Sequence, residues 1–190
     1  MNPRHSRKRR NSIRQKIRPM VTREHQLADA VCQHKLRHLK RMIDGGADIN
    51  TTDRNGYTPL LYAAWAGDTE ALDLLLQAGT AAGINHRDSE EGVTPLHAAV
   101  IICRDIEGAS AENVFRLIAA GADANIPDSD GWTPLHSCAF YHLPHLIPAL
   151  LSAGADPALR DMWGNTPGDI ARSKSHTDII PLLERAANAP

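Results

Sequence analysis

The stretch GWTPLHSCAFYHL, residues 131–143, decides the fold because its Thr-Pro pair recurs along the 190-residue chain. Successive pairs are separated by 36, 39 and 33 residues. A near-constant period in this range is typical of repeat proteins, in which each unit buries its apolar face against its neighbours. We therefore predict a stack of similar units. The pairs are Thr58-Pro59, Thr94-Pro95, Thr133-Pro134 and Thr166-Pro167.

Each period predicts two short helices. Threonine is a good N-cap and proline is favoured at the first helical position, so every Thr-Pro pair predicts a helix start. This first helix carries small residues, such as Ala63-Ala64 and Cys138-Ala139, which allow close helix packing. The second helix is rich in leucine, isoleucine and valine, and we expect it to end at a glycine in the left-handed conformation. These glycines are Gly46, Gly79, Gly121 and Gly154.

A tight turn is expected before each Thr-Pro pair. Aspartate and glycine suit such reversals, and a D-x-x-G pattern or a close variant precedes every pair. The four expected turns are Asp53–Gly56, Ser89–Gly92, Asp128–Gly131 and Asp161–Gly164.

With its T-P-L-H, G-A-D and D-x-x-G signatures, the chain resembles the ankyrin repeat family, whose units are about 33 residues long. The resemblance implies an all-α fold, an α-solenoid of helix-turn-helix units with short β-turn or hairpin fingers. It also implies that His97 and His136 tie neighbouring turns together by hydrogen bonds; Leu61 departs from the pattern at the equivalent position. The predicted repeats, about five in number, are residues 24–53, 54–88, 89–128, 129–161 and 162–187.

The resemblance implies a non-catalytic protein–protein interaction module that uses a concave groove lined by the fingers and the first helices. Six of the eight aromatic residues fall at these variable positions. Exposed apolar patches mark interaction sites, and tyrosine and tryptophan dominate binding hot spots. The alternative is that the rings pack inside the chain, between neighbouring units. The predicted contact residues are Tyr57, Trp65, Ile101, Ile102, Trp132, Phe140, Tyr141 and Trp163.

Acidic residues are expected to rim the same side. A partner with a basic surface would be steered toward them, whereas the plainer interpretation is a solvated surface. Two insertions, within residues 79–92 and 100–114, belong either to the binding face or to neutral loop variation. The acidic residues are Asp88, Glu90, Glu91, Asp128 and Asp130.

No motif in the sequence predicts catalysis, a cofactor or a metal. The pairs His34/His38 and His142/His145 have helical spacing but lack further ligands at a metal-binding spacing. Neither a phosphate-binding glycine motif nor a G-x-S-x-G nucleophile motif occurs. We therefore expect the protein not to be an enzyme, with no catalytic residues and no bound cofactor or metal.

The N-terminal residues 1–23 form a basic arm, expected to be disordered. They carry nine lysines and arginines and no acid, whereas the rest of the chain carries twelve basic and twenty-two acidic residues. Residues 4–18 could be a nuclear localisation signal, bind nucleic acid or anionic membranes, act as a transit peptide, fold back on the acidic body, or only aid solubility. Two alternatives to the interaction module remain open: a nuclear or nucleic-acid-associated regulatory factor, and a small bacterial effector or immunity-type protein.

The remaining composition predicts a cytoplasmic monomer, or a nuclear one if the arm is a localisation signal. Cys32, Cys103 and Cys138 are an odd and widely spaced set, which favours reduced thiols. No run of 18 apolar residues and no signal-peptide pattern occurs, so we expect no membrane span.

Overall fold

The computed structural model describes residues 26–79, 83–103 and 109–187, and it confirms the all-α prediction. This part of the chain holds ten helices and no strand. The basic arm and parts of both insertions lie outside the described residues. The helix pairs are α2 (Gln26–Cys32) with α3 (Leu36–Asp44), α4 (Pro59–Ala66) with α5 (Thr69–Gln77), α6 (Pro95–Ile102) with α7 (Ala109–Ala119), α8 (Pro134–Tyr141) with α9 (Ile147–Ser152), and α10 (Pro167–Ser173) with α11 (Ile180–Ala187).

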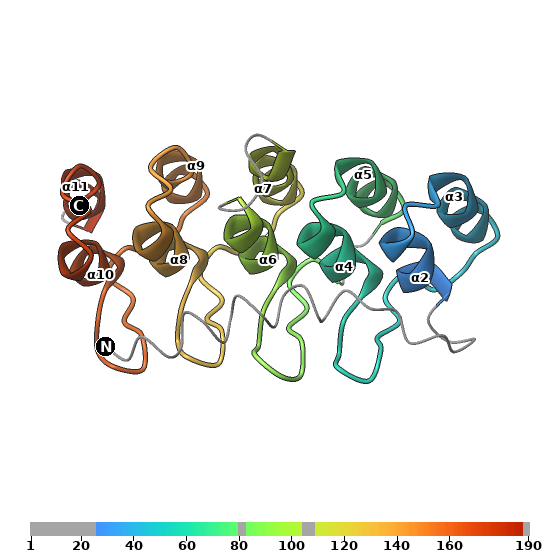
Figure 1. The fold of residues 1–190 in the computed structure, drawn as a ribbon, viewed down its shortest axis with the longest axis horizontal. Coiled ribbons are helices and arrows are strands. Elements are labelled where there is room, and N and C mark those ends of the chain that lie inside the picture. The colour runs from blue at the N-terminus through green and yellow to red at the C-terminus, as the bar shows by residue number, and fades with distance from the viewer. Residues whose placement is uncertain (1–25, 80–82, 104–108, 188–190) are drawn as a thin grey trace.

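The helices form two parallel rows, as a solenoid requires (Figure 1). The inner row is α2, α4, α6, α8 and α10, and each of these helices contacts the next along the row. The outer row is α3, α5, α7, α9 and α11, each packed on the inner helix that precedes it in the chain. Four turns extend from the inner row on the side away from the outer row, and we call them fingers 1 to 4. Their residues are 53–57, 88–93, 128–132 and 161–165.

Threonine caps begin α4, α6 and α10, as predicted. The Thr58 Oγ1 atom accepts a hydrogen bond from the Leu61 N–H at 3.1 Å, and proline is the first residue of α4. The same arrangement begins α6 and α10, where Thr94 and Thr166 cap the N–H three residues on. At the other end of each unit, the four predicted glycines all have positive φ. The local signals in the sequence therefore place the helix ends correctly.

Histidine ties neighbouring units together, as the family resemblance implied. The Nδ1 atom of His97 accepts from the Thr94 N–H, which leaves Nε2 to donate to the Trp132 carbonyl of the next finger at 2.8 Å. His136 repeats the bond one unit later, to the Asn165 carbonyl at 3.2 Å. Burial lowers the pKa of His136, so the ring is neutral and keeps the acceptor that this geometry needs.

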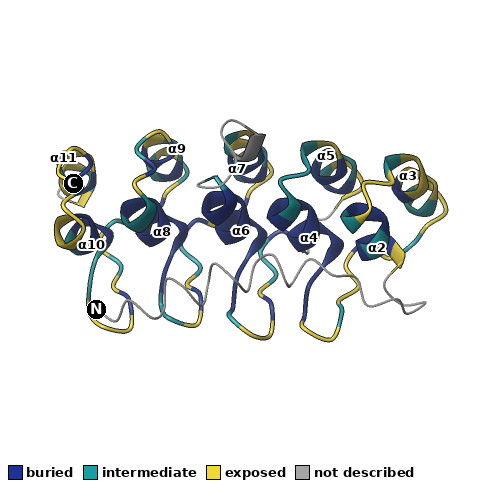
Figure 2. Cartoon of the chain, in the orientation of Figure 1, coloured by how far each residue is buried: buried dark blue, intermediate teal, exposed yellow. Residues whose placement is uncertain are grey.

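The core runs continuously along the stack, between the two rows (Figure 2). The inner helices are buried over most of their length, whereas exposed residues gather on the outer helices and the finger tips. Small residues at the packed positions of the inner helices are fully buried, among them Ala63, Ala99 and Cys138. They allow neighbouring helices to approach, and they leave room that larger side chains must fill.

Candidate partner-binding surface

The structure places only one of the eight predicted contact residues on the open surface. Trp163 is 53% exposed, and Phe140 and Tyr141 are half-buried. The prediction that these residues are exposed is therefore wrong for the other five, which lie in the core. These five are Tyr57, Trp65, Ile101, Ile102 and Trp132.

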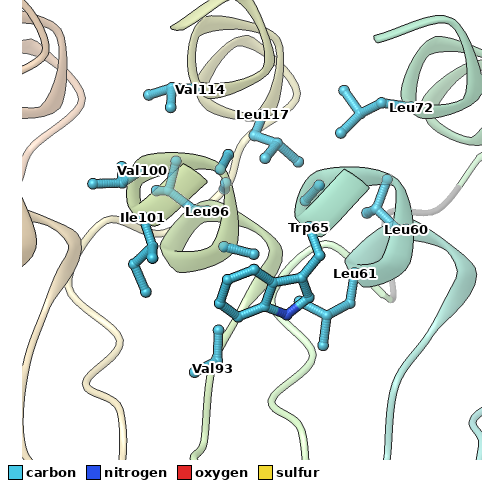
Figure 3. Close-up of a cluster of buried hydrophobic side chains, with 14 of the residues drawn as sticks. Leu60, Leu61, Trp65, Leu72, Val93, Leu96, Val100, Ile101, Val114 and Leu117 are labelled. Carbon is cyan, nitrogen blue, oxygen red and sulfur yellow. The ribbon is translucent and has the colours of Figure 1, made fainter. Parts of the chain in front are cut away.

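Trp65 shows why the rings turn inward. Its indole lies between α4 and α6, with Leu61 on one side and Val93 of finger 2 on the other (Figure 3). All three residues belong to the same buried cluster. Because the packed positions of α4 and α6 hold alanines, the space between these helices is filled by a large ring. Trp65 therefore joins two units, and only 8% of it meets solvent.

Trp132 begins a row of three rings beside α8. Its centroid lies 5.2 Å from that of Phe140, and Phe140 lies 5.0 Å from Tyr141 at nearly a right angle. The Lys174 ammonium, from the end of α10, lies 4.1 Å from the centroid of Phe140. Edge-to-face pairs and cation–π contacts at these distances are attractive. Phe140 and Lys174 thus join α8 to the end of α10, and only the outer part of the row of rings reaches the surface.

Backbone hydrogen bonds join each finger to the next. The N–H of Ser89 donates to the Asn55 carbonyl at 2.9 Å, and that of Ser129 donates to the Glu91 carbonyl at 2.8 Å. The N–H of Met162 completes the series by donating to the Asp130 carbonyl at 3.0 Å. The four fingers are therefore one ladder, and their tips form a continuous edge below the inner helices (Figure 1).

Two of the predicted rim acids have a structural role instead. Asp128 is 4% exposed, and its carboxylate accepts from the N–H groups of Asp130 and Trp132. Asp88 is 5% exposed and accepts from three N–H groups within finger 2. The prediction that they rim the groove is wrong, because a turn of this shape needs a buried acceptor for its amides.

The same contacts correct the register of finger 2. The sequence pattern equated Ser89 with the aspartate that opens the other fingers, but Asp88 fills that role. Finger 2 is accordingly one residue longer than the others. Glu90 is exposed at its tip, and Glu91 is half-buried.

Within the fingers, the exposed side chains lie at the tips. We define the finger edge as Glu90, Glu91, Asp130, Met162 and Trp163. Met162 is 64% exposed, and the repeat pattern did not predict it as a contact residue. The signal that could have found it is positional: the tip of finger 4 carries two large apolar residues, and no further unit follows within the described residues to cover them.

The metal-ligating and nucleophilic side chains of the described residues bear on the sequence predictions of no metal and no catalytic residue. They contain no group of three histidine, cysteine or acidic side chains that could hold a metal ion. Burial raises the pKa of Cys32 to about 11 and that of Cys138 further, so both are protonated thiols rather than nucleophiles. Among these residues no helix is at once long and apolar enough to cross a bilayer.

Comparison with known proteins agrees with this architecture. A family model described as ankyrin repeats (3 copies) matches residues 27–109 and 101–189. A fowlpox virus protein named as an ankyrin repeat protein is 36% identical over 76% of the chain and 42% of its own length. The mouse B-cell lymphoma 3 protein homolog is 32% identical over 78% of the chain and 33% of its own length.

The mouse RelA-associated inhibitor is 37% identical over 64% of the chain and 14% of its own length. The chain thus spans less than half the length of these curated relatives. Because the family model covers most of the chain, and because the helix pairs, fingers and histidine ties fit it, this protein belongs to the ankyrin repeat family.

Proposed function

We propose that this protein binds a partner protein, without catalysing a reaction, and that the finger edge is the contact surface. Ankyrin repeats are a protein-interaction module, and they make up nearly all of this chain after residue 26. One relative is named for its association with RelA, which is the kind of role that this proposal extends to the present chain.

The observation that carries the proposal is the exposure of Met162 and Trp163. They are adjacent, and 64% and 53% exposed, although the other two tryptophans of the chain are buried. A tryptophan side chain can bury about 150–250 Å². Covering the exposed half of Trp163 would contribute about 2–3 kcal/mol at about 25 cal/mol per Å², before ordering costs. A single residue of that weight is typical of a binding hot spot.

Phe140 and Tyr141 remain candidate contacts, because both are half-buried at the end of α8. The five buried residues of the predicted set support the surface without touching the partner. The acidic tips of fingers 2 and 3 would favour a partner with basic residues. The nuclear, nucleic-acid and bacterial-effector alternatives depend on residues 1–23 or on the origin of the chain, and they stay predictions.

The test is affinity capture with two matched variants. Trp163→Ala should lose the bound protein, because it removes the largest exposed side chain of the finger edge. Phe115→Ala is the control: Phe115 is 41% exposed on α7, in the outer row. Both variants should unfold like the parent chain. Equal capture by the two variants would overturn the proposal, as would loss in the Phe115 variant alone.

A further inference from the structure

The tip of finger 4 is the largest apolar feature left open on the finger edge. At the corresponding glycines of fingers 1 and 3, the next finger approaches closely: a Cβ on Gly131 would lie 2.8 Å from the Met162 nitrogen. Among the described residues, nothing lies within 4 Å of a Cβ placed on Gly164. Finger 4 is thus the open end of the ladder, and Met162 and Trp163 lie there with large exposed areas.

The negative charge of the finger edge favours a basic segment over a second copy of the chain. Next to Met162 along the ladder are Asp130 and then Glu91 and Glu90, all exposed or half-buried. A second copy would present the same acidic tips, so two finger edges would repel each other. The complementary segment on this chain is residues 4–18, with eight of the arm's nine basic side chains and no acid. That segment also contains isoleucines, which could cover the open apolar tip.

The chain is long enough for this contact. Packed helices are about 8–10 Å apart, so the inner row from α2 to α10 spans about 40 Å. An extended chain covers about 3.3 Å per residue, so Asn11 can reach about 50 Å from the start of α2. Because the arm is tethered, its effective concentration at the finger edge is in the millimolar range. Docking then needs a binding free energy of about 4 kcal/mol. Exposed ion pairs contribute up to about 1 kcal/mol each, and covering the apolar tip of finger 4 contributes the rest.

We propose that residues 4–18 dock along the finger edge of their own chain and occupy it until a partner displaces them. The docking is inferred from the finger edge and the sequence of the arm alone. The displacement by a partner also depends on the proposed function. A purified chain with no partner present therefore tests the first part separately from the second.

The experiment is site-specific photocrosslinking in the full chain. The photoreactive amino acid p-benzoylphenylalanine replaces Asn11, which keeps every basic residue of the arm. After irradiation, mass spectrometry should find adducts on fingers 2 to 4, with Met162 prominent because thioethers react readily. A triple variant, Glu90→Lys, Glu91→Lys and Asp130→Lys, should lower the yield about tenfold, the effect expected of three lost exposed ion pairs.

A second triple variant controls for net charge. Asp44→Lys, Glu70→Lys and Glu112→Lys change the charge equally on the outer helices, and the yield should stay at the level of the parent chain. An equal mixture of ¹⁵N-labelled and unlabelled chains shows whether arm and fingers belong to one molecule. The proposal is overturned by adducts of mixed isotope only, by adducts on other elements, by no adducts, or by equal loss in both triple variants.

Discussion

Asn113 on α7 is a polar residue in an apolar position. It is fully buried, and neither its amide nitrogen nor its amide oxygen has a hydrogen-bond partner in the described residues. The equivalent position, 33 residues on, is Leu146, the residue just before α9, and it is also fully buried. An unsatisfied buried amide destabilises a fold by about 1–3 kcal/mol. The sequence places Asn113 on the helix but does not reveal its missing partners.

Asn113→Leu should therefore stabilise the chain. The substitution removes the unpaired amide and restores the side chain that the next unit uses, so the free energy of unfolding should rise by about 1–2 kcal/mol. The matched control is Asn125→Leu, because Asn125 donates to the Gly154 carbonyl at 2.8 Å and accepts from the Asp156 N–H at 2.7 Å. Urea unfolding should show opposite signs for the two variants; destabilisation by both would contradict this explanation.

His34 predicts a pH dependence. Its Nδ1 atom lies 2.7 Å from the Asp68 carboxylate of the next unit, and this hydrogen bond and charge raise the pKa of His34. A raised folded pKa stabilises the fold fully below the unfolded pKa, near 6.5, and the stabilisation is lost as pH rises through the folded pKa. His34→Gln should therefore lower the urea midpoint at pH 5.5 and have a smaller effect at pH 9.

The control is His38→Gln, four residues on and exposed on α3. Subtracting its effect on the urea midpoint at each pH value isolates the contribution of the contact between His34 and Asp68. A His34→Gln effect of equal size at both pH values would show that protonation of His34 does not contribute to stability.

At the level of elements, the fingers work as a ladder rather than as four separate turns. The sequence predicted three of the turns from an aspartate and a glycine and the second from Ser89 and Gly92, and the structure has a turn at each site. What the pattern could not supply is the contact between turns, since Ser89, Ser129 and Met162 donate through their backbones. Any residue other than proline has a backbone N–H, so the sequence does not indicate which residues make these bonds. The extra residue in finger 2 also concealed that Asp88, not Ser89, holds that turn.

A comparison of Gly131 with Gly164 distinguishes two reasons for a glycine: a positive φ and close packing against a neighbouring finger. Both have φ near +80°, so alanine at either position costs about 1–2 kcal/mol. At Gly131 an added Cβ would also meet the backbone of finger 4 at 2.8 Å, whereas at Gly164 it would meet no atom of the described residues within 4 Å. Gly131→Ala should therefore destabilise by about 1–3 kcal/mol more than Gly164→Ala. Equal losses in urea unfolding would refute the stacking of fingers 3 and 4.

At the level of the whole molecule, the inward rings decide where a partner can bind. Thr-Pro pairs and glycines predicted the helix ends, and the resemblance predicted the histidine ties of His97 and His136. The direction of Trp65 and Trp132 was not predictable, because it depends on the space that alanines leave between neighbouring helices. Trp132→Ala therefore does not test binding, because it opens a cavity in the core and lowers the free energy of unfolding by about 3–5 kcal/mol.

The central claim is that the stack buries Trp65 and Trp132 and leaves Trp163 as the accessible tryptophan of the three. Acrylamide quenching of tryptophan fluorescence tests it directly, in about 0.5 M NaCl so that contacts between exposed charges are screened. Trp163→Phe should remove most of the quenching and shift the emission to shorter wavelength, whereas Trp132→Phe should leave the quenching in place. Loss of quenching in Trp132→Phe, with Trp163→Phe unchanged, would contradict the claim.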